Sequence, residues 1–327
     1  MGDCIYTQSQ KKITYGGIVI TNYINNYRAR EAMGCFFNRQ RSISLSKYEP
    51  WTDDANVFEW VVRIRTCFQA LNIPWKMKYD LLMRDVYHAY NSDIPFHNRR
   101  HAYDVFQMGV CLFHRNASKM RGVSSLRKFT YCLALLCHDA DHRGYTNQDM
   151  EEHGEIAYDD TEDDDIESMC SERSYNEKHH ISYAKRLVHK HGVDMDTELF
   201  TRLISKTDLA TNKRSPKDVV KTPDDMMVLF VQLADVGHVL RPWDVHLSFV
   251  CALNRERSTP LSVEDLPEDT LQFNRTFVIP LLSIINTFNT QLAQSLWTRY
   301  KTNKRQWGIV NGYFSEARRT RTESHAE

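Results

Sequence analysis

Residues 125–142, SLRKFTYCLALLCHDADH, join an apolar segment to a cluster of imidazole and carboxylate groups. The large apolar side chains of this segment recur every three or four positions, which is typical of one face of an α-helix. They are Leu126, Phe129, Leu133 and Leu136. The segment is therefore predicted to be a core helix that runs into His138 and brings the polar cluster to the helix end.

The same periodicity predicts helices through most of the chain from residue 52 onward. The expected start signals are Thr52-Asp53-Asp54 for the first helix, Pro74 for the second and Pro95 for the third. Strand patterns do not alternate with helix patterns, so a parallel α/β sheet is not expected and the fold class is predicted to be all-α. Gly16-Gly17, between β-branched residues, predicts a small hairpin in a short N-terminal extension.

The composition narrows the class of protein. Lys and Arg number 42 and so do Asp and Glu, which argues against broad binding to nucleic acid or to a membrane surface. No apolar run reaches the roughly 18 residues of a membrane span, and residues 1–7 lack the apolar segment of a secretory signal. The eight cysteines include no Cys-x-x-Cys, which argues against a zinc-thiolate site. Several, such as Cys67, Cys132 and Cys137, lie among apolar residues, which indicates reduced core cysteines in a cytoplasmic protein. Any metal ligands are therefore expected to be nitrogen and oxygen.

Four polar stretches carry the candidate chemistry: residues 97–101, 138–142 and 177–180, and Asp235. Buried histidine and aspartate are costly unless something compensates them, and a metal ion compensates several at once. The four-residue spacings of His97 to His101 and of His138 to His142 predict that each pair shares one face of a helix. A structural polar network is the competing interpretation, but two such pairs beside aspartates favour a metal-centred hydrolase.

Such a site suits phosphoryl chemistry. Two divalent ions bridged by one carboxylate can share a water, lower its pKa towards 7 and so supply a hydroxide that attacks phosphorus in line. A separate acid must then protonate the leaving oxygen. One histidine is therefore expected to stay off the metal.

Two longer motifs resemble the signatures of class I cyclic-nucleotide phosphodiesterases. They are His97-Asn98-x-x-His101-Ala102-x-Asp104-Val105-x-Gln107 and His138-Asp139-x-Asp141-His142-x-Gly144-x-x-Asn147. Shorter motifs follow in the family's order: Ser174-x-x-Glu177-x-His179-His180, Thr207-Asp208, Ala234-Asp235 and Arg241-Pro242-Trp243. The resemblance covers about residues 52–310 and implies a compact all-α catalytic domain of roughly sixteen helices. The domain is placed at residues 51–312, after an extension of residues 1–50. The polar and charged composition of residues 313–327 predicts a disordered tail.

The resemblance also implies the metal ligands. The tighter ion, Zn²⁺, would be held by His101, His138, Asp139 and Asp235. Two histidines and two carboxylates with open water positions suit zinc. Asp139 would bridge to a second ion, Mg²⁺ or Mn²⁺, whose other ligands are mostly waters.

By the same resemblance, His97 would be the general acid that protonates the ribose O3′ and releases a nucleoside 5′-monophosphate. His142 would belong to the catalytic group and, with Glu177 and Thr207, would contact the waters of the two ions. Asp104 is interpreted as structural. The implied substrate is a 3′,5′-cyclic nucleotide, cAMP or cGMP.

The base-binding part departs from the family's pattern. Phe273 falls on the aromatic clamp of the purine site, although a plain core aromatic is the alternative. The position of the family's purine-binding glutamine falls on Thr270, and the nearest glutamine is Gln272, turned by about 200° on a helix. Leu253 falls on the aliphatic side of the clamp. His238 replaces a polar residue that is often asparagine near the base, so the base preference stays open.

Other functions stay open as alternatives. The altered glutamine and a loop after Glu256 that is shorter than usual motivate a cyclic-nucleotide-binding regulator with weak turnover. Another phosphohydrolase with a histidine–aspartate metal core is the second alternative. The complete metal set and the presence of His97 favour the phosphodiesterase. No nucleic-acid partner is expected, and a homodimer is one open oligomeric state.

Overall fold

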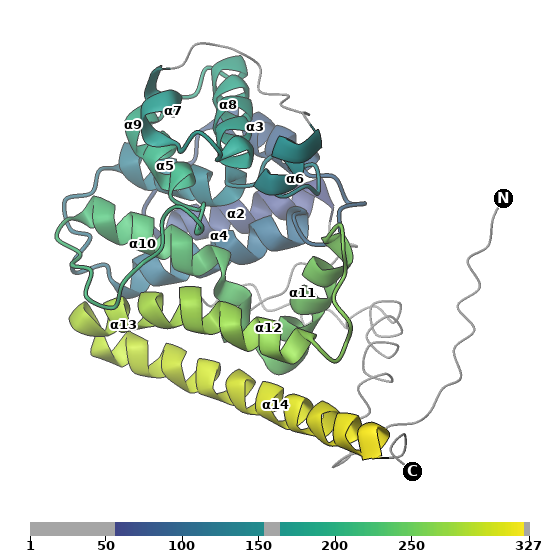
Figure 1. Cartoon of the computed structure of the whole chain (residues 1–327). Helices are drawn as coiled ribbons and strands as arrows, with labels where there is room; N and C mark the ends of the chain where they lie inside the picture. Colours follow the sequence, from purple (N-terminus) through teal and green to yellow (C-terminus); the bar gives the residue numbers. More distant parts are fainter. Residues whose placement is uncertain (1–55, 154–163, 324–327) are drawn as a thin grey trace. The chain divides into compact units, whose positions relative to one another are not determined.

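The computed structural model describes residues 56–153 and 164–323, of which residues 56–153 and 164–309 belong to one compact unit (Figure 1). Every regular element of the described residues is helical, which confirms the predicted all-α class. The α-helices are α2 (Val57–Ala70), α3 (Met77–His88), α4 (Arg99–Arg115), α5 (Ser125–Cys137), α6 (Asn147–His153), α7 (Asp164–Met169), α8 (Tyr175–Lys190), α9 (Thr197–Ser205), α10 (Pro223–Asp235), α11 (Trp243–Glu256), α12 (Leu266–Phe273), α13 (Ile279–Phe288) and α14 (Thr290–Glu323). A 3-10 turn, η1 (Gly237–Leu240), precedes α11, and a π-helical turn, η2 (Asn274–Val278), follows α12.

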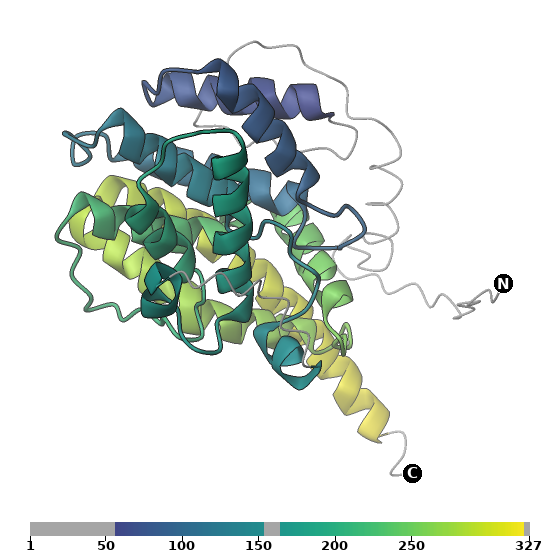
Figure 2. The same cartoon turned by 90° about the horizontal axis from the view of Figure 1, so that it is seen from above.

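The core is centred on α4, which packs against both α5 and α10. Figure 2 shows the same helices seen from above. α5 packs against α4, α8 and α9, so all of its residues from 129 to 137 are buried rather than the single predicted face. A helix surrounded by other helices can be apolar on every side. Cys132 and Cys137 of α5 lie among these core side chains, in agreement with the interpretation of core thiols. Both polar clusters at the ends of α5 and α10 are thereby anchored in rigid structure.

The starts of α2 and α3 can be set beside their sequence signals. α2 begins at Val57, after Asn56, whose side chain accepts hydrogen bonds from two backbone N–H groups of the first turn at 3.0 and 3.1 Å. This cap satisfies N–H groups that have no partner within the helix. The predicted start at residues 52–54 lies outside the described residues, as does the predicted hairpin. α3 begins at Met77, three residues after Pro74.

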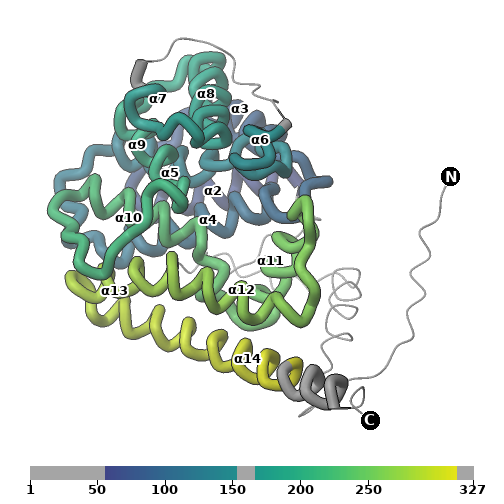
Figure 3. The backbone as a smooth tube through the Cα atoms, in the orientation of Figure 1, coloured from purple at the N-terminus to yellow at the C-terminus, as the bar shows by residue number. Residues whose placement is uncertain are grey.

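The C-terminal helices close one side of the unit (Figure 3). Asn303 of α14 donates hydrogen bonds to the carbonyl oxygens of Val239 and Arg241, at 2.9 and 2.8 Å, and so ties α14 to η1 and the start of α11. α14 continues to Glu323, so helix occupies most of the segment that was predicted to be a disordered tail. Among the described helices, none combines the length and the apolar character needed to cross a bilayer.

A buried ion pair joins α4 to the segment before α11. Asp104 and Arg241 are only 3% and 6% exposed, and the Arg241 Nε donates to the Asp104 carboxylate at 2.8 Å. A second guanidinium nitrogen donates to the Asp104 carbonyl oxygen at 3.1 Å. This arrangement agrees with the structural interpretation of Asp104.

Asp104→Ala is expected to lower the free energy of unfolding by about 3–5 kcal/mol, because it leaves the Arg241 charge buried without its partner. Urea unfolding would measure the change. Asp194→Ala is the control, since Asp194 is 77% exposed and its contact with Lys78 is 3.4 Å long, so it should cost under about 1 kcal/mol. Equal losses in the two variants would contradict the structural role.

Candidate active site

The polar cluster after α5 lies in a turn and not on a continuing helix. α5 ends at Cys137, and Asp141 has a φ of 61°, a left-handed conformation that an α-helix cannot contain. The Asp141 N–H donates to the carbonyl oxygen of Ala89 at 3.1 Å, which ties the turn to the end of α3. The prediction that His138 and His142 share a helix face is therefore wrong.

The first histidine pair is also not a helical pair. α4 begins at Arg99, and its cap is Asn98, whose side chain accepts from the Arg100 N–H at 2.9 Å. His97 thus precedes the helix on which His101 lies, and the capped chain turns it towards the second cluster. Its ring stacks on that of His142, with centroids 4.0 Å apart and planes inclined by 22°.

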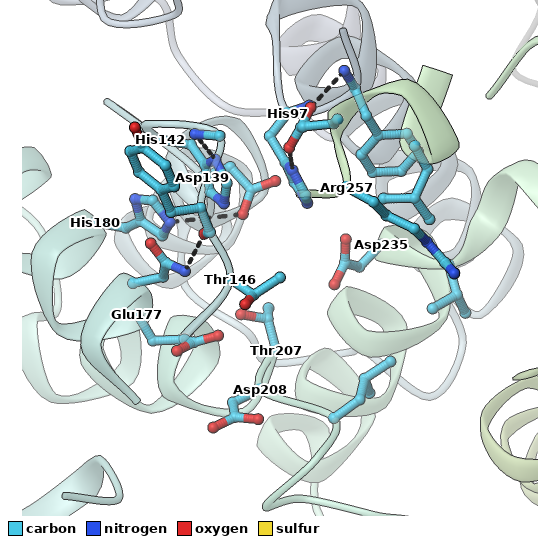
Figure 4. A pocket seen from close by; sticks show the side chains of 18 of the residues that line it. His97, Asp139, His142, Thr146, Glu177, His180, Thr207, Asp208, Asp235 and Arg257 are labelled. Atoms are coloured by element: carbon cyan, nitrogen blue, oxygen red, sulfur yellow. Dashed lines mark hydrogen bonds and ion pairs between the residues drawn. The ribbon is translucent and has the colours of Figure 1, made fainter. Parts of the chain in front are cut away.

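Glu256, at the end of α11, holds His97 in place. Its carboxylate accepts from the N–H groups of Phe96 and His97, at 2.7 and 3.0 Å, and contacts His97 Nδ1. Burial would raise the pKa of Glu256, but the contacts with His97 and the two N–H groups lower it. The carboxylate therefore stays ionised and holds the Nδ1 proton, while the other ring nitrogen of His97 points into the pocket (Figure 4).

Below this pair, the structure brings together the four residues that the sequence assigned to the tighter metal. Their ligand atoms all lie within 4.8 Å of one another: those of His101, His138, Asp139 and Asp235. The His101 Nε2 is 3.2 Å from both the His138 Nε2 and the Asp235 Oδ1. His138 contacts the Leu135 carbonyl oxygen through Nδ1 at 3.1 Å, so its Nε2 faces the cluster.

This donor set fits a divalent cation. The Asp139 Oδ2 is buried and has no hydrogen-bond partner in the described part of the chain, although such an oxygen requires compensation. Two imidazole nitrogens converge beside it and beside the Asp235 carboxylate, at distances of 3.1–3.4 Å. Zinc and related divalent ions bind imidazole nitrogens and carboxylate oxygens, and the cluster supplies two of each.

The charges of the cluster are strongly interdependent. Burial alone would raise the pKa of Asp139 and of Asp235, but the contacts with His101 and His138 lower both pKa values. The pKa of Asp235 falls to about 2. The carboxylates in turn raise the pKa of both histidines against the effect of burial. Protons on the histidines therefore compete with a cation, so the affinity for a divalent ion should fall as the pH is lowered.

The opposite wall of the pocket carries the oxygen atoms of Thr207 and Glu177 (Figure 4). The Thr207 hydroxyl donates to the Ile204 carbonyl oxygen at 2.8 Å, which leaves its lone pairs to accept. Glu177 accepts from the Asn147 amide at 3.0 Å. Burial and the neighbouring Asp208 raise the pKa of Glu177 to about 7.

The raised pKa of Glu177 predicts a pH-dependent stability. Between the ordinary pKa of 4.5 and the folded value of about 7, the folded state holds a proton that the unfolded state has released. The free energy of unfolding should therefore fall as the pH rises through this window. We expect the free energy of unfolding of the wild type to fall by on the order of 2 kcal/mol more than that of Glu177→Gln between about pH 5 and about pH 8. Urea unfolding of both proteins after chelator treatment, at the two pH values, measures this difference. The same pH dependence in the wild type and in Glu177→Gln would contradict the raised pKa of Glu177.

His180 is a member of the site to which the sequence analysis gave no role. Its Nδ1 contacts the Ala140 carbonyl oxygen at 2.7 Å, and its Nε2 lies 3.8 Å from the Asp139 Oδ1. Burial lowers its pKa to about 4, so the ring is neutral. The sequence signal that could have identified His180 was the adjacent pair His179-His180. His179 itself contacts the Asp141 carboxylate at 2.9 Å and so supports the turn.

The apolar side of the pocket contains three of the five residues predicted to bind the base, which are Phe273, Leu253 and His238. The other two predictions are corrected. Gln272 is exposed and accepts from the guanidinium of Arg275 at 2.9 and 3.1 Å, because its position on α12 turns it to the outside. Thr270 is buried but does not line the pocket.

A sequence profile of the family described as 3′5′-cyclic nucleotide phosphodiesterase matches residues 96–299. The matched span contains His97, Glu256 and the whole four-residue cluster. It also contains all the residues that line the pocket.

Curated relatives carry related names. A cGMP-specific 3′,5′-cyclic phosphodiesterase alpha of Plasmodium falciparum (isolate 3D7) is 22% identical over 302 residues, which cover 82% of this chain and 30% of that protein. A high affinity cGMP-specific 3′,5′-cyclic phosphodiesterase 9A of Drosophila melanogaster is 27% identical over 183 residues, 49% of this chain and 11% of that protein. Isoform F of a 3′,5′-cyclic-AMP phosphodiesterase of Drosophila melanogaster is 27% identical over 222 residues, which cover 68% of this chain and 31% of that protein. The chain thus spans less than a third of the length of each of these relatives.

Solved structures share the fold. Two crystal structures of the phosphodiesterase domain of a rhodopsin phosphodiesterase from the choanoflagellate Salpingoeca rosetta superpose with TM-scores of 0.69 and 0.71. Both are 19% identical in sequence, and they cover 84% and 85% of this chain and 98% and 95% of theirs. The helical arrangement described above is therefore that of a phosphodiesterase domain.

Proposed function

The chain belongs to the 3′,5′-cyclic nucleotide phosphodiesterase family, and from this premise we propose that it hydrolyses 3′,5′-cyclic nucleotides to nucleoside 5′-monophosphates. One observation carries the proposal: the four-residue cluster and the His97–Glu256 pair open into the same pocket. We place the catalytic domain at residues 51–312.

In this proposal, His101, His138, Asp139 and Asp235 hold Zn²⁺, and Asp139 also contributes to a second site for Mg²⁺ or Mn²⁺. The Asp139 Oδ2 supports this assignment, because it is buried without a hydrogen bond from the described residues while two imidazole nitrogens lie 3.1 and 3.3 Å from it. Divalent ions bound there would supply a water of lowered pKa and neutralise part of the phosphate charge. Glu177 and Thr207, on the facing wall, accept hydrogen bonds from water and hold it in the pocket.

His97 supplies the proton for the leaving group. A water oxygen bonds to phosphorus, the bond from phosphorus to O3′ breaks, and the proton on His97 Nε2 moves to O3′. Glu256 keeps the Nδ1 proton in place and stabilises the charged ring before the transfer. His142 stacks on His97 and accepts from the Gly144 N–H through Nδ1 at 2.9 Å, so its own N–H is on Nε2.

Incubation of the purified 327-residue chain with cAMP or cGMP, in the presence of Mn²⁺ or Mg²⁺, tests the proposal. We expect a 5′-monophosphate, identified by chromatography, whose formation stops when the ions are chelated. If neither cyclic nucleotide yields this product, the proposed function is wrong. Tight binding of a cyclic nucleotide without turnover would instead favour the regulator.

A further inference from the structure

Three buried rings form a hydrogen-bonded row behind the apolar side of the pocket. They are Trp307 of α14, His246 of α11 and His238 of η1. The Trp307 Nε1 is 2.8 Å from the His246 Nε2, and the His246 Nδ1 is 3.1 Å from the His238 Nδ1. The rings are 2%, 0% and 6% exposed, so the row is shielded from bulk water.

The chemistry of the first ring determines the protonation of the other two. An indole N–H can only donate a hydrogen bond, so the His246 Nε2 must accept. A neutral imidazole has one N–H, so His246 carries its proton on Nδ1 and donates it to the His238 Nδ1. His238 must then carry its own proton on Nε2.

Both histidines are held neutral, as this chain of donors requires. Burial lowers the pKa of His246 to about 3. Burial, followed by the neighbouring His246, lowers the pKa of His238 well below its ordinary value. Neither ring has a carboxylate in hydrogen-bond contact that would stabilise its charged form among the described residues.

The free nitrogen of His238 is accessible from the pocket. His238 lines the pocket together with Leu253 and Phe273, and its ring lies 5.9 Å from that of Phe96, which also lines it. Its Nε2 has no hydrogen-bond partner in residues 56–153 and 164–323, and it is not among the fully buried polar atoms. If the phosphate of a cyclic nucleotide lies beside Asp139 and Asp235, its base lies on this apolar side of the pocket.

We propose that Trp307 and His246 hold His238 as an N–H donor that meets the substituent at C6 of the base. N7 accepts in both purines, so the group at C6 alone separates them there, and the pocket prefers an oxygen at C6, guanine over adenine. This inference rests on the proposed function. On one edge guanine presents two neighbouring acceptors, N7 and O6, whereas adenine presents the N7 acceptor beside an amino donor. An N–H that faces an amino group leaves two donors without acceptors.

The first test compares kcat/KM of the 327-residue chain for cGMP, cAMP and cyclic IMP, the last of which carries O6 but lacks the 2-amino group. We expect cGMP and cyclic IMP to exceed cAMP by about tenfold or more. Equal values, or a preference for cAMP, would overturn the inference. A preference for cGMP that cyclic IMP does not share would also overturn it, because the 2-amino group and not O6 would then be recognised.

Trp307→Phe tests Trp307 as a positioning residue, because phenylalanine keeps an aromatic ring but has no N–H. We expect the preference for cGMP to fall to about threefold or less, since His246 is then free to adopt either tautomer. Trp243→Phe is the matched control. The Trp243 ring packs 4.9 Å from that of Trp307 and 5.9 Å from that of His246, but its N–H donates to no described residue. The control should keep the preference, and equal effects of the two variants would contradict the role of Trp307.

Nitrogen-15 NMR of histidine-labelled protein reads the tautomer directly and does not depend on turnover. We expect a protonated Nε2 and an unprotonated Nδ1 for His238, and a mixture of tautomers in Trp307→Phe. The opposite tautomer in the wild-type chain would overturn the inference. If neither nucleotide is hydrolysed, the proposed function is wrong, and the tautomer and the relative affinities for cGMP and cAMP still decide the base preference.

Discussion

His97→Ala is expected to lower kcat for cyclic-nucleotide hydrolysis by about 10²–10⁴-fold, the usual loss for a positioned general acid. The reason is geometric, because Glu256 holds one ring nitrogen and the other faces the pocket. The content of the tighter ion should not change, because His97 lies outside the four-residue cluster. Steady-state kinetics and elemental analysis by mass spectrometry measure the two quantities.

A substrate that needs no acid provides the control for this prediction. A phosphodiester with a p-nitrophenolate leaving group departs without protonation, so His97→Ala should hydrolyse it nearly as well as the wild type does. Equal losses on both substrates would mean that His97 has another role. His97, His142 and Glu256 also offer ligand atoms within 4.8 Å of one another, so loss of an ion in His97→Ala would make it a ligand.

Asp235→Asn is expected to abolish binding of the tighter ion and to lower kcat on the order of 10³-fold or more. The Asp235 Oδ1 lies 3.2 Å from the His101 Nε2 and 3.4 Å from the His138 Nε2, so an amide there removes the anion between the two imidazoles. Metal stoichiometry by mass spectrometry, measured beside kcat, checks both parts.

Asp208→Asn is the matched control for Asp235→Asn. Asp208 lines the same pocket, but its carboxylate accepts from the Ser174 hydroxyl at 2.5 Å and lies outside the cluster. This variant should keep the tighter ion. If Asp235→Asn retained a full complement of metal, the assignment of the cluster as the metal site would be contradicted.

The candidate ligands could be found from the sequence because their residue types are costly to bury. His138 and Asp139 follow the apolar second half of α5, and Asp235 ends the apolar second half of α10, so each required a compensating partner. The local backbone could not be found in the same way. A four-residue spacing occurs in helices and in turns alike, and the left-handed φ of Asp141 depends on a contact with the end of α3.

Pairs far apart in the sequence were the least accessible to prediction. Glu256 contacts His97 across 159 positions, and no periodicity within α11 reports such a partner. Its place three residues after Leu253, on the same helix face, was the available signal. The prediction that Gln272 binds the base was wrong for a related reason, since the orientation of its side chain depends on how α12 packs against the rest of the unit.

Hydrolysis in water enriched in oxygen-18 tests the central claim most directly, because it shows which bond breaks. If water attacks phosphorus and His97 protonates O3′, the 5′-monophosphate will carry one heavy oxygen in its phosphate and none on the ribose, as mass spectrometry of the product would show. A heavy oxygen at the 3′ carbon, or a product without the label, would contradict this account of the site.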